Sequence, residues 1–546
     1  MKRRSFLQAG IAAGVGLSLA RHAHARAPRL QTDSLQLHAF IEAHPQAVFI
    51  RRTSVANKIA KAEKRTVGKE FAAELFTPAE GGDISFGNAL AIKPNLTCTS
   101  GTGNTPAGMG IITDLDFLHG MVDGITTRGF PGGNMFAREG NWLGDGYCAG
   151  EYNVTGVLVE QMAQQYGMHV HDFPTGRQLR DMTLETLEEG TEVIWRDVPD
   201  GKVFRRIGYV APFNDDDSWL LNIAKFKTHG MGMTLCAKNL QGMAISPYVR
   251  FCEGVDATKT HPGSVLTDFR ADFEQNIDAL YAEHLARGIP RWDRPGRGST
   301  GGYGMETWAQ RTCDSHSITR TGLNIIEGIY GHNGDGFNAG PGPGGTPEDI
   351  MSNILIFGKN PFHVDIIGTW LAGHEPGNFG LFHIAHERGL SPLFNPASIP
   401  LYDWNAGQPS PIKLADVERT PLVCPYLTQD YNGGDEEKYH LVDEPFDYST
   451  VSAADAPALP TKPSIVALGN PVRHTALLEV NLPRAASVQV AVYNQLGARV
   501  DVLREGRHRA GTHSIRWLPG RLSAGVYFAV LHSTAGTAQC KLLLLR

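Results

Sequence analysis

Short apolar runs alternate with helical segments between residues 50 and 442. The runs at 88–93, 219–226 and 354–357 have the length and composition of buried strands. Helices are predicted over 54–76, from an N-cap at Thr113 to a stop at Gly129, over 153–166 and over 361–371. Strands that alternate with helices in this way predict an α/β core with a mostly parallel sheet over 50–442.

The pattern changes after this core. Residues 443–463 are rich in Asp, Pro, Ala and Ser and show no apolar period, which predicts a linker. From 464 to 546 helix signals are absent, apolar and polar residues alternate at 488–492, and further short strands are predicted around 513–517 and 526–531. This texture predicts a small all-β sandwich at the end of the chain.

The first 25 residues predict an export signal that is removed. Arg3 and Arg4 lie in the opening sequence KRRSFLQ, an apolar stretch follows over 9–20, and the sequence AHA at 23–25 is a small-x-small cleavage site. Paired arginines ahead of such a stretch are the signal read by the twin-arginine export machinery, which carries folded proteins. We therefore expect an exported protein of the periplasm, cell surface or extracellular space. An ordinary secretory signal is the alternative.

Net charge, hydropathy and cysteine spacing argue against several classes of protein. The net charge is −6, and it becomes −10 without residues 1–25, because these carry four positive charges and no acids. A chain this acidic is a poor nonspecific ligand for nucleic acid, so no nucleic-acid partner is expected. No later apolar stretch is long enough to predict a transmembrane segment in the mature chain. None of the seven cysteines forms a C-x-x-C pair, so a ferredoxin-type motif is absent from the sequence.

Polar residues that could carry chemistry gather just after the predicted strands, where ligands of parallel sheets bind. The candidates are Lys93 and Asn95, then Lys227 and His229, then Lys238 and Asn239, and finally Asp335 with the Gly-rich run 339–345. A lysine beside a sheet core is costly unless it meets an anion. We therefore expect these lysines to bind an anionic small molecule, with His229 as the acid–base residue. The alternative is that each lysine extends separately into water.

A metal site is a second possibility. The candidate ligands are His229, Cys236, His332, His363 and Asp365. Their spacing matches no recognised ligand pattern, so a structural role for each is the competing interpretation. The sequence also contains no phosphate-binding P-loop, dinucleotide fingerprint or triad-type nucleophile motif.

Several of these segments together resemble the family called domain of unknown function 362. The matching pieces are IKPNL at 92–96, KFKTHGMGMTLCAKNLQG at 225–242, IIEGIYGHNGDG at 325–336, KNPFHVDIIGTWLAG at 359–373 and HERGL at 386–390. The resemblance extends from about Asn57 to Leu390. It implies that the family's motif positions are occupied here by Lys93, Asn95, Lys227, His229, Lys238, Asn239, Asp335 and Asp365.

The resemblance implies no particular reaction. Many members of the family are associated with iron–sulfur clusters and carry added ferredoxin-type cysteines, from which this sequence departs. Asp335 and Asp365 are expected either to orient His229 or to hold a metal. Three functions therefore stay open: an enzyme acting on an anionic small molecule, a metal- or iron–sulfur-associated redox protein, and a non-catalytic surface binding protein.

The C-terminal segment resembles a different group. Its pieces are Asn470-Pro471, Val490 to Asn494 with Gly497, AGTH at 510–513, Trp517, AGVYF at 524–528 and the final KLLLLR. In this order they are similar to the immunoglobulin-like domains of flagellar hook-capping proteins and type IX secretion sorting tails. The resemblance implies that residues 464–546 form an immunoglobulin-like sandwich for sorting or attachment. An outer-membrane sorting machine is then an expected partner, with docking to a cell-surface partner as the alternative.

Overall fold

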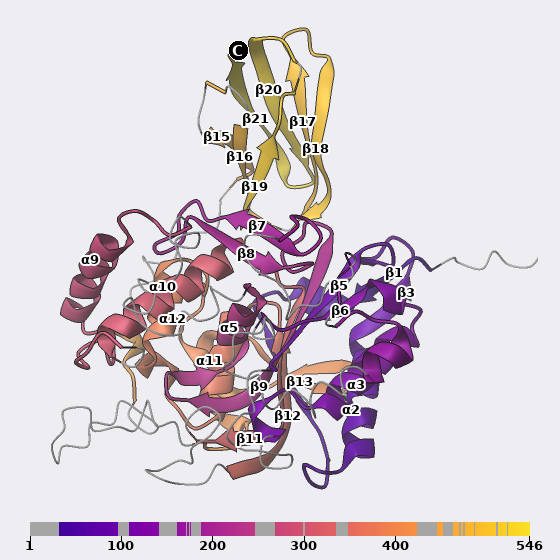
Figure 1. Ribbon diagram of the computed structural model, residues 1–546, viewed down its shortest axis with the longest axis vertical. Coiled ribbons are helices and arrows are strands. Elements are labelled where there is room, and N and C mark those ends of the chain that lie inside the picture. Colours follow the sequence, from indigo (N-terminus) through magenta and orange to yellow (C-terminus); the bar gives the residue numbers. More distant parts are fainter. Residues whose placement is uncertain are drawn as a thin grey trace, which may run out of the picture.

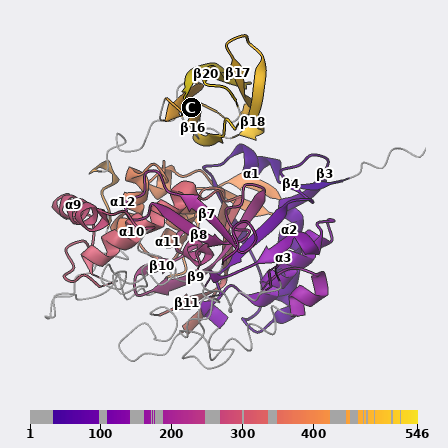
Figure 2. The same ribbon diagram turned by 45° about the horizontal axis from the view of Figure 1, so that its top comes forward.

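The computed structural model describes residues 32–96, 109–140, 161–245, 268–334, 348–422, 445–450 and 462–545, with short gaps inside the third, fourth and last of these ranges. Figure 1 shows a large α/β core and a separate C-terminal sandwich of strands, and the turned view of Figure 2 shows the same division. Both parts of the predicted fold class are therefore confirmed.

A nine-stranded sheet forms the centre of the core. Its strands are β2 (Val48–Arg52), β5 (Ala89–Pro94), β6 (Met135–Ala137), β9 (Ser218–His229), β10 (Gly232–Thr234), β11 (Leu323–Asn333), β12 (Glu348–Gly358), β13 (Leu401–Asn405) and β14 (Gln408–Pro411). The order is β14-β13-β2-β12-β11-β9-β5-β6, and β10 pairs with the end of β9. The neighbours β6, β5, β9 and β11 run parallel, whereas β12 is antiparallel to both of its neighbours. The predicted mostly parallel sheet is confirmed.

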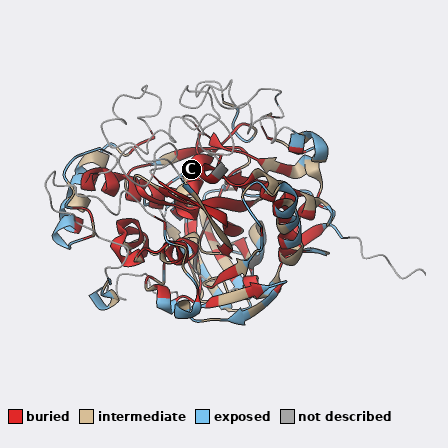
Figure 3. Ribbon diagram, turned by 90° about the horizontal axis from the view of Figure 1, so that it is seen from below, coloured by how far each residue is buried: buried red, intermediate tan, exposed pale blue. Residues whose placement is uncertain are grey.

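Helices cover both faces of this sheet. They are α2 (Lys61–Leu75) and α3 (Leu115–Thr126) on one face, and α5 (Cys236–Asn239), α10 (Gly302–Ile318), α11 (Pro361–Leu371) and α12 (Gly380–Glu387) on the other. Ile325 and Ile326 are consecutive in β11, and they belong to the two different hydrophobic clusters. Because successive strand residues point to opposite faces, the central strand β11 carries apolar residues on both faces rather than on one. Figure 3 shows the sheet buried and the exposed residues at the periphery.

Most predicted elements form, with shifted ends. The strand at 88–93 is β5, and the helix at 361–371 is α11, with Asn360 as its N-cap. The helix predicted at 54–76 begins only at Lys61, because residues 53–60 form turns. The N-cap of α3 is Asp114 and not Thr113, so that prediction is wrong: the Thr113 hydroxyl donates instead to the carbonyl of Ile223. Of the helix predicted at 153–166, only 161–166 lies among the described residues, and it is helical.

The remaining elements of the core lie outside the central sheet. They are β1 (Ser34–Leu37), α1 (Ala39–Ala43), β3 (Phe76–Ala79), β4 (Ile84–Ser85), β7 (Val193–Asp197), β8 (Arg206–Val210) and α9 (Phe273–Ala286), together with short 3₁₀ turns such as η1 (Met109–Ile111) and η6 (Leu240–Met243). No described helix is long and apolar enough to cross a membrane.

The C-terminal sandwich has two antiparallel sheets and a hydrophobic core of its own. The strands are β15 (Ser464–Leu468), β16 (Ala476–Leu482), β17 (Ala486–Asn494), β18 (Arg499–His508), β19 (Gly511–Trp517), β20 (Gly525–Ser533) and β21 (Gly536–Leu544). They form the sheets β15-β16-β19 and β18-β17-β20-β21. Val490, Val492 and Trp517 are fully buried between these sheets, in a cluster separate from those of the α/β core.

Part of the segment before the sandwich packs on the α/β core. In the first half of the range 443–463, the structure describes residues 445–450. These residues end in a 3₁₀ turn at Tyr448–Thr450. The ring centroids of Phe446 and His383 are 5.3 Å apart, and those of Tyr448 and Phe394 are 5.5 Å apart. These aromatic contacts show that at least this stretch is fixed to the core.

A buried histidine joins three of the helices. His284 of α9 lies 2.6 Å through Nδ1 from Glu306 of α10 and 3.2 Å through Nε2 from Glu387 of α12. Trp292 donates its Nε1–H to Glu306, and Arg287 donates to Glu387. Burial by itself lowers the pKa of His284, but the hydrogen bonds and charges of the two glutamates outweigh it and raise the pKa to about 9.

This histidine is expected to make stability depend on pH. A pKa raised in the folded state gives stabilisation that is complete below the ordinary value of 6.5 and is lost as the pH rises through about 9. We expect denaturant unfolding of the wild type and His284→Gln to differ by roughly 2–3 kcal/mol near neutral or mildly acidic pH. The difference should shrink as the pH approaches the folded-state pKa. Arg287→Gln is the control, and a pH-independent difference for His284→Gln would contradict the assignment.

Candidate functional site

The carboxyl-terminal end of β5 holds Lys93 inside the protein. Its side chain is fully buried, and its Nζ donates to Glu139 Oε2 at 2.6 Å, to the carbonyl of Pro94 at 2.5 Å and to Asn239 Oδ1 at 3.3 Å. Burial lowers the pKa of Lys93, the charge and hydrogen bond of Glu139 oppose this, and the charge of Lys238 adds to the lowering. Lys93 is therefore a paired buried cation.

A ladder of asparagines fixes the position of Lys93. Asn239 donates its Nδ2 to the carbonyl of Lys93 at 3.1 Å and to Asn222 Oδ1 at 2.8 Å. Asn222 is the neighbour of Lys93 in the parallel pairing of β5 and β9, and it donates to Asn324 Oδ1 of β11 at 2.9 Å. Three adjacent strands are thus linked by side-chain amides. The structure gives Asn239 a structural contact with Lys93, in the place where the sequence predicted a ligand-binding residue.

Gly242 makes room for the pair of Lys93 and Glu139. A Cβ atom at this position would lie 2.0 Å from Glu139 Oε1 and 2.8 Å from Lys93 Cε. No residue with a side chain fits there without displacing the carboxylate. The glycine of the sequence KNLQG at 238–242 therefore serves close packing against the site.

Lys227 lies near the end of β9 and differs from the other buried lysines. Its side chain is 1% exposed, yet its Nζ makes no hydrogen bond or ion pair with any residue that the structure describes. Burial lowers the pKa of Lys227 far below its ordinary value, and the charge of Lys238 adds to this, as do those of Lys225 and Lys93. Glu139 opposes the shift. Lysines 93, 227 and 238 thus lie close enough to repel one another, and we call them the lysine cluster.

His229 follows Lys227 by two residues and borders the same cluster. It is half-buried, and its Nδ1 accepts a hydrogen bond from the backbone N–H of Met231 at 3.0 Å. Burial lowers the pKa of His229 well below its usual range, and the charges of Lys238 and Lys227 lower it further. The structure therefore brings His229 beside the lysine cluster as a neutral imidazole, while its role as an acid–base residue stays a prediction.

Lys225 provides a comparison two residues before Lys227. It is also fully buried, but its Nζ lies 2.8 Å from Glu327 Oε2, which belongs to β11. The Tyr330 ring covers the same Nζ, whose distance to the ring centroid is 3.5 Å. Glu327 in turn accepts the backbone N–H of Asp114. Lys225 is therefore neutralised within a structural network.

A row of polar side chains crosses the sheet at the register of Lys227. Lys227 is paired with Thr234 of β10 on one side and with His332 of β11 on the other, and His332 is paired with Asp349 of β12. Register partners of neighbouring strands point to the same face. His332 Nδ1 lies 2.9 Å from Asp349 Oδ1. We call Thr234, Lys227, His332 and Asp349 the register row.

Two atoms of this row are buried without a partner. Thr234 Oγ1 and His332 Nε2 are both inaccessible to solvent, and neither has a hydrogen-bond partner among the residues that the structure describes. Asp349 also receives Lys58 Nζ at 2.8 Å. Although burial alone raises the pKa of Asp349, the hydrogen bonds from His332 and Lys58 hold it below its ordinary value. The carboxylate therefore fixes His332 with Nδ1 as the donor and leaves Nε2 open.

Asp365 belongs to α11 and contacts the start of α5. Its carboxylate accepts the backbone N–H groups of Cys236 and Ala237, both at 2.7 Å. Burial raises the pKa of Asp365 to about 8, against these hydrogen bonds. Because α5 carries Lys238 and Asn239, Asp365 positions the segment that supplies them. It does not contact His229 in the described structure, contrary to one expected orienting role.

Of the remaining predicted site residues, the structure describes Asn95 but not Asp335 or the Gly-rich run 339–345. Asn95 is buried, and its backbone N–H donates to Thr113 Oγ1 at 2.8 Å. Asp335 and the Gly-rich run 339–345 lie outside the described residues, so the prediction that they border the site is not tested.

Of the candidate metal ligands, Cys236 and Asp365 are in contact, and no larger set of them comes together among the described residues. Within the described ranges, no group of three or more His, Cys, Asp or Glu residues is arranged to hold a metal ion. His363 is occupied through both ring nitrogens, by the carbonyl of Gln46 and the N–H of Leu393. Burial raises the pKa of the Cys236 thiol well above its usual value, and Asp365 adds to this. The cysteines likewise do not fit a ferredoxin-type cluster, because none of them is paired as C-x-x-C.

Sequence reasoning did not find Glu139, Thr234 or Asp349, and it named His332 only as a possible metal ligand. Glu139 follows a strand of three residues, which is too short to be recognised as an apolar run. Thr234 and Asp349 are identified only by strand register. Thr234 is a polar residue within apolar surroundings, whereas Asp349 follows Thr346, Pro347 and Glu348 and has no such sequence signal.

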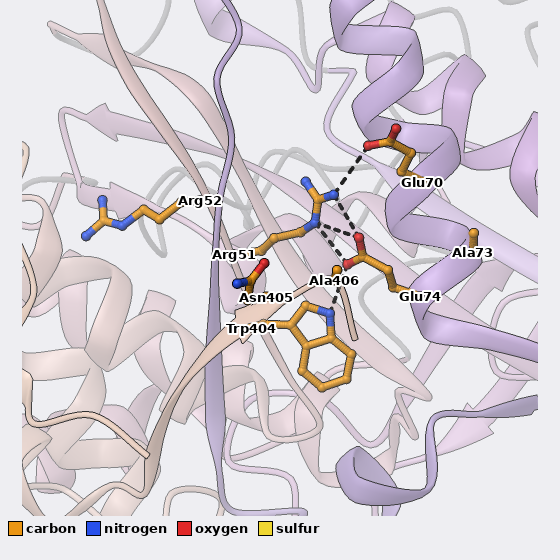
Figure 4. Close-up of a pocket in the computed structure, with 8 residues that line it drawn as sticks. All are labelled: Arg51, Arg52, Glu70, Ala73, Glu74, Trp404, Asn405 and Ala406. Atoms are coloured by element: carbon orange, nitrogen blue, oxygen red, sulfur yellow. Dashed lines mark hydrogen bonds and ion pairs between the residues drawn. The ribbon is translucent and has the colours of Figure 1, made fainter. Parts of the chain in front are cut away.

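A cavity of about 460 Å³ lies elsewhere, between β2, α2 and the turn after β13. Figure 4 shows Arg51 directed at Glu74, which also accepts the indole N–H of Trp404. The nitrogen–oxygen distances of the pair formed by Arg51 and Glu74 are 2.8, 2.9 and 3.2 Å. In the sheet order, β12 and β11 separate this cavity from β9. Its central polar groups satisfy one another, so it is not the candidate site.

Comparison with curated proteins gives no match. Among solved structures, a crystal structure of dimeric latent PorU from Porphyromonas gingivalis matches with 18% identity and a TM-score of 0.12. The match covers 15% of this chain and 9% of that chain, so it carries no argument about fold or function. The family model described as a domain of unknown function (DUF362) matches residues 90–370, more than half of the 546 residues. The chain therefore belongs to the DUF362 family.

Proposed function

We propose that this protein is an enzyme that acts on a small anionic molecule held by the lysine cluster. The observation that carries the proposal is that Lys227 is buried with no ion pair among the described residues, while the charges of Lys238 and Lys93 both act on it. Buried cations without counterions are unfavourable. Burial is the main cause of the lowered pKa of Lys227, and repulsion from Lys238 adds to it; a bound anion would offset both, and this gain would appear as binding affinity.

The neighbouring imidazoles favour catalysis over simple capture. A binding site needs only the cations, whereas His229 and His332 add imidazole nitrogens that can accept and donate protons. His229 Nδ1 accepts from a backbone N–H, which leaves the other ring nitrogen as the one that carries the proton in the neutral form. If the protein only captured the anion, replacing these two histidines would leave anion binding unchanged and there would be no turnover to lose. In an enzyme the same replacement would lower turnover.

We also propose that the chain is exported through the twin-arginine route and that the sandwich serves sorting or attachment. The support is the sequence KRRSFLQ and the similarity of the last 80 or so residues to sorting tails. The separate hydrophobic core of the sandwich agrees with a module whose folding does not depend on the lysine cluster.

Calorimetric titration with inorganic phosphate, sulfate and malonate tests the anion site. We expect at least one of these to bind the wild type, and Lys238→Gln to weaken binding at least about tenfold, since it removes a charge from a poorly solvated site. Lys61→Gln is the matched control, because Lys61 is an exposed lysine at the start of α2. Failure of all three anions to bind, or equal weakening by Lys61→Gln, would overturn the proposal.

A further inference from the structure

We propose that Lys227 is an amine nucleophile that forms an imine with a carbonyl compound bearing an anionic group, and that His332 relays the protons of this step. The inference rests on the proposed function, because the rest of the lysine cluster would hold the anionic end of that compound. It assigns a covalent role to a residue for which sequence reasoning expected only charge.

Lys227 is the exception among the fully buried lysines of the described chain. Three others each meet a carboxylate: Lys64 lies 2.5 Å from Asp114, Lys93 lies 2.6 Å from Glu139, and Lys225 lies 2.8 Å from Glu327. Lys227 is as deeply buried and has no such partner there. A desolvated lysine beside other cations is the arrangement that keeps an amine neutral and nucleophilic. The strongly lowered pKa of Lys227 agrees with this.

The groups that imine formation needs lie on both sides of Lys227. Thr234 Oγ1 and His332 Nε2 belong to its register partners, and both are buried with nothing to bond to in the described residues. An unsatisfied buried polar atom costs about 1–3 kcal/mol, so a group that satisfies two of them at once is favoured. A carbonyl oxygen accepts from the threonine hydroxyl, and the imidazole receives and returns protons.

The chemical step balances without an oxidant or reductant. The Nζ lone pair attacks the carbonyl carbon, a C–N bond forms, and the carbonyl π electrons move to oxygen. His332 Nε2 takes one proton from Nζ and passes it to this oxygen, and a second proton follows by the same path. The C–O bond then breaks, the oxygen leaves as water, and the nitrogen lone pair completes the C=N bond.

Reductive trapping tests the proposal. Mature protein is incubated with pyruvate, glyceraldehyde 3-phosphate or acetone in sodium cyanoborohydride, and the adducts are mapped by peptide mass spectrometry. We expect an adduct at Lys227 with a carboxylated or phosphorylated carbonyl, whichever anion the site prefers, and little with uncharged acetone. In His332→Gln the trapping rate should fall by at least about 100-fold, which is the contribution of a general acid–base group. Phosphate or malonate binding by that variant should persist.

The outcomes separate this inference from the proposed function. Anion binding without an adduct at Lys227 would overturn the imine and leave the anion site standing, whereas loss of both would overturn both. Equal labelling of Lys225, or of exposed lysines, would also overturn it, because labelling would then report solvent access. If His332→Gln does not fold, Thr234→Val is the second variant; unchanged trapping in it would remove the register row from the step.

Discussion

Lys93→Met is expected to lower the free energy of unfolding by about 3–5 kcal/mol, because it leaves a carboxylate buried without its cation. The side chains of Lys93 and Glu139 are 0% and 3% exposed, and their charged atoms are 2.6 Å apart. Glu139 Oε2 has one other donor, the backbone N–H of Leu96 at 3.2 Å. One backbone hydrogen bond does not replace an ion pair. Denaturant unfolding at neutral pH measures the loss.

A matched double variant separates charge from packing. Lys93→Met combined with Glu139→Gln removes both charges and keeps both side-chain volumes, so it should recover most of the lost stability. If the single variant instead costs less than about 1 kcal/mol, which is the range of an ordinary surface substitution, the pair does not hold the end of β5 in place.

Lys227→Met is expected to have the opposite effect on stability, raising the free energy of unfolding by roughly 1–3 kcal/mol. The methionine keeps the apolar stem and removes an amine that has no counterion among the described residues. The repulsion from Lys225, Lys93 and Lys238 disappears with it. The same change should abolish imine formation at residue 227, which is the trade of stability for function that active sites often show.

The comparison is Lys225→Met, two residues earlier on β9. It removes the cation from Glu327, whose side chain is 0% exposed, and should therefore destabilise by about 3–5 kcal/mol. Unfolding curves of the two variants, measured side by side, should move in opposite directions. If Lys227→Met destabilises as much as Lys225→Met, then Lys227 has a counterion in the folded protein and the anion site is wrongly placed.

The strand ends of this fold were predictable from sequence because the apolar runs are distinct and the rule for parallel sheets is simple. Lys93 ends the run that becomes β5, and Lys227 lies in the extension of the run that becomes β9. Parallel pairing of these strands then brings the two lysines to one edge. The prediction needed only chain order and strand direction.

The pairing of charges was not predictable in the same way. Lys225 and Lys227 have the same residue type, the same strand and nearly the same surroundings in sequence, yet one has a carboxylate partner and the other does not. Glu139 is close to Lys93 only because β6 takes the edge position beside β5. Such facts follow from strand order and register, which single-sequence patterns do not contain.

The irregular course of β11 explains how two similar lysines acquire different neighbours. Glu327 is opposite Lys225 and His332 is opposite Lys227, so β11 advances five residues while β9 advances two. In an uninterrupted ladder Lys227 would face Ile329, an apolar residue, and no imidazole would reach it. The extra residues of β11 therefore determine that His332, and not Ile329, lies opposite Lys227. A deletion that shortened β11 between Glu327 and His332 would therefore remove His332 from its place opposite Lys227, although all four residues of the register row would still be present.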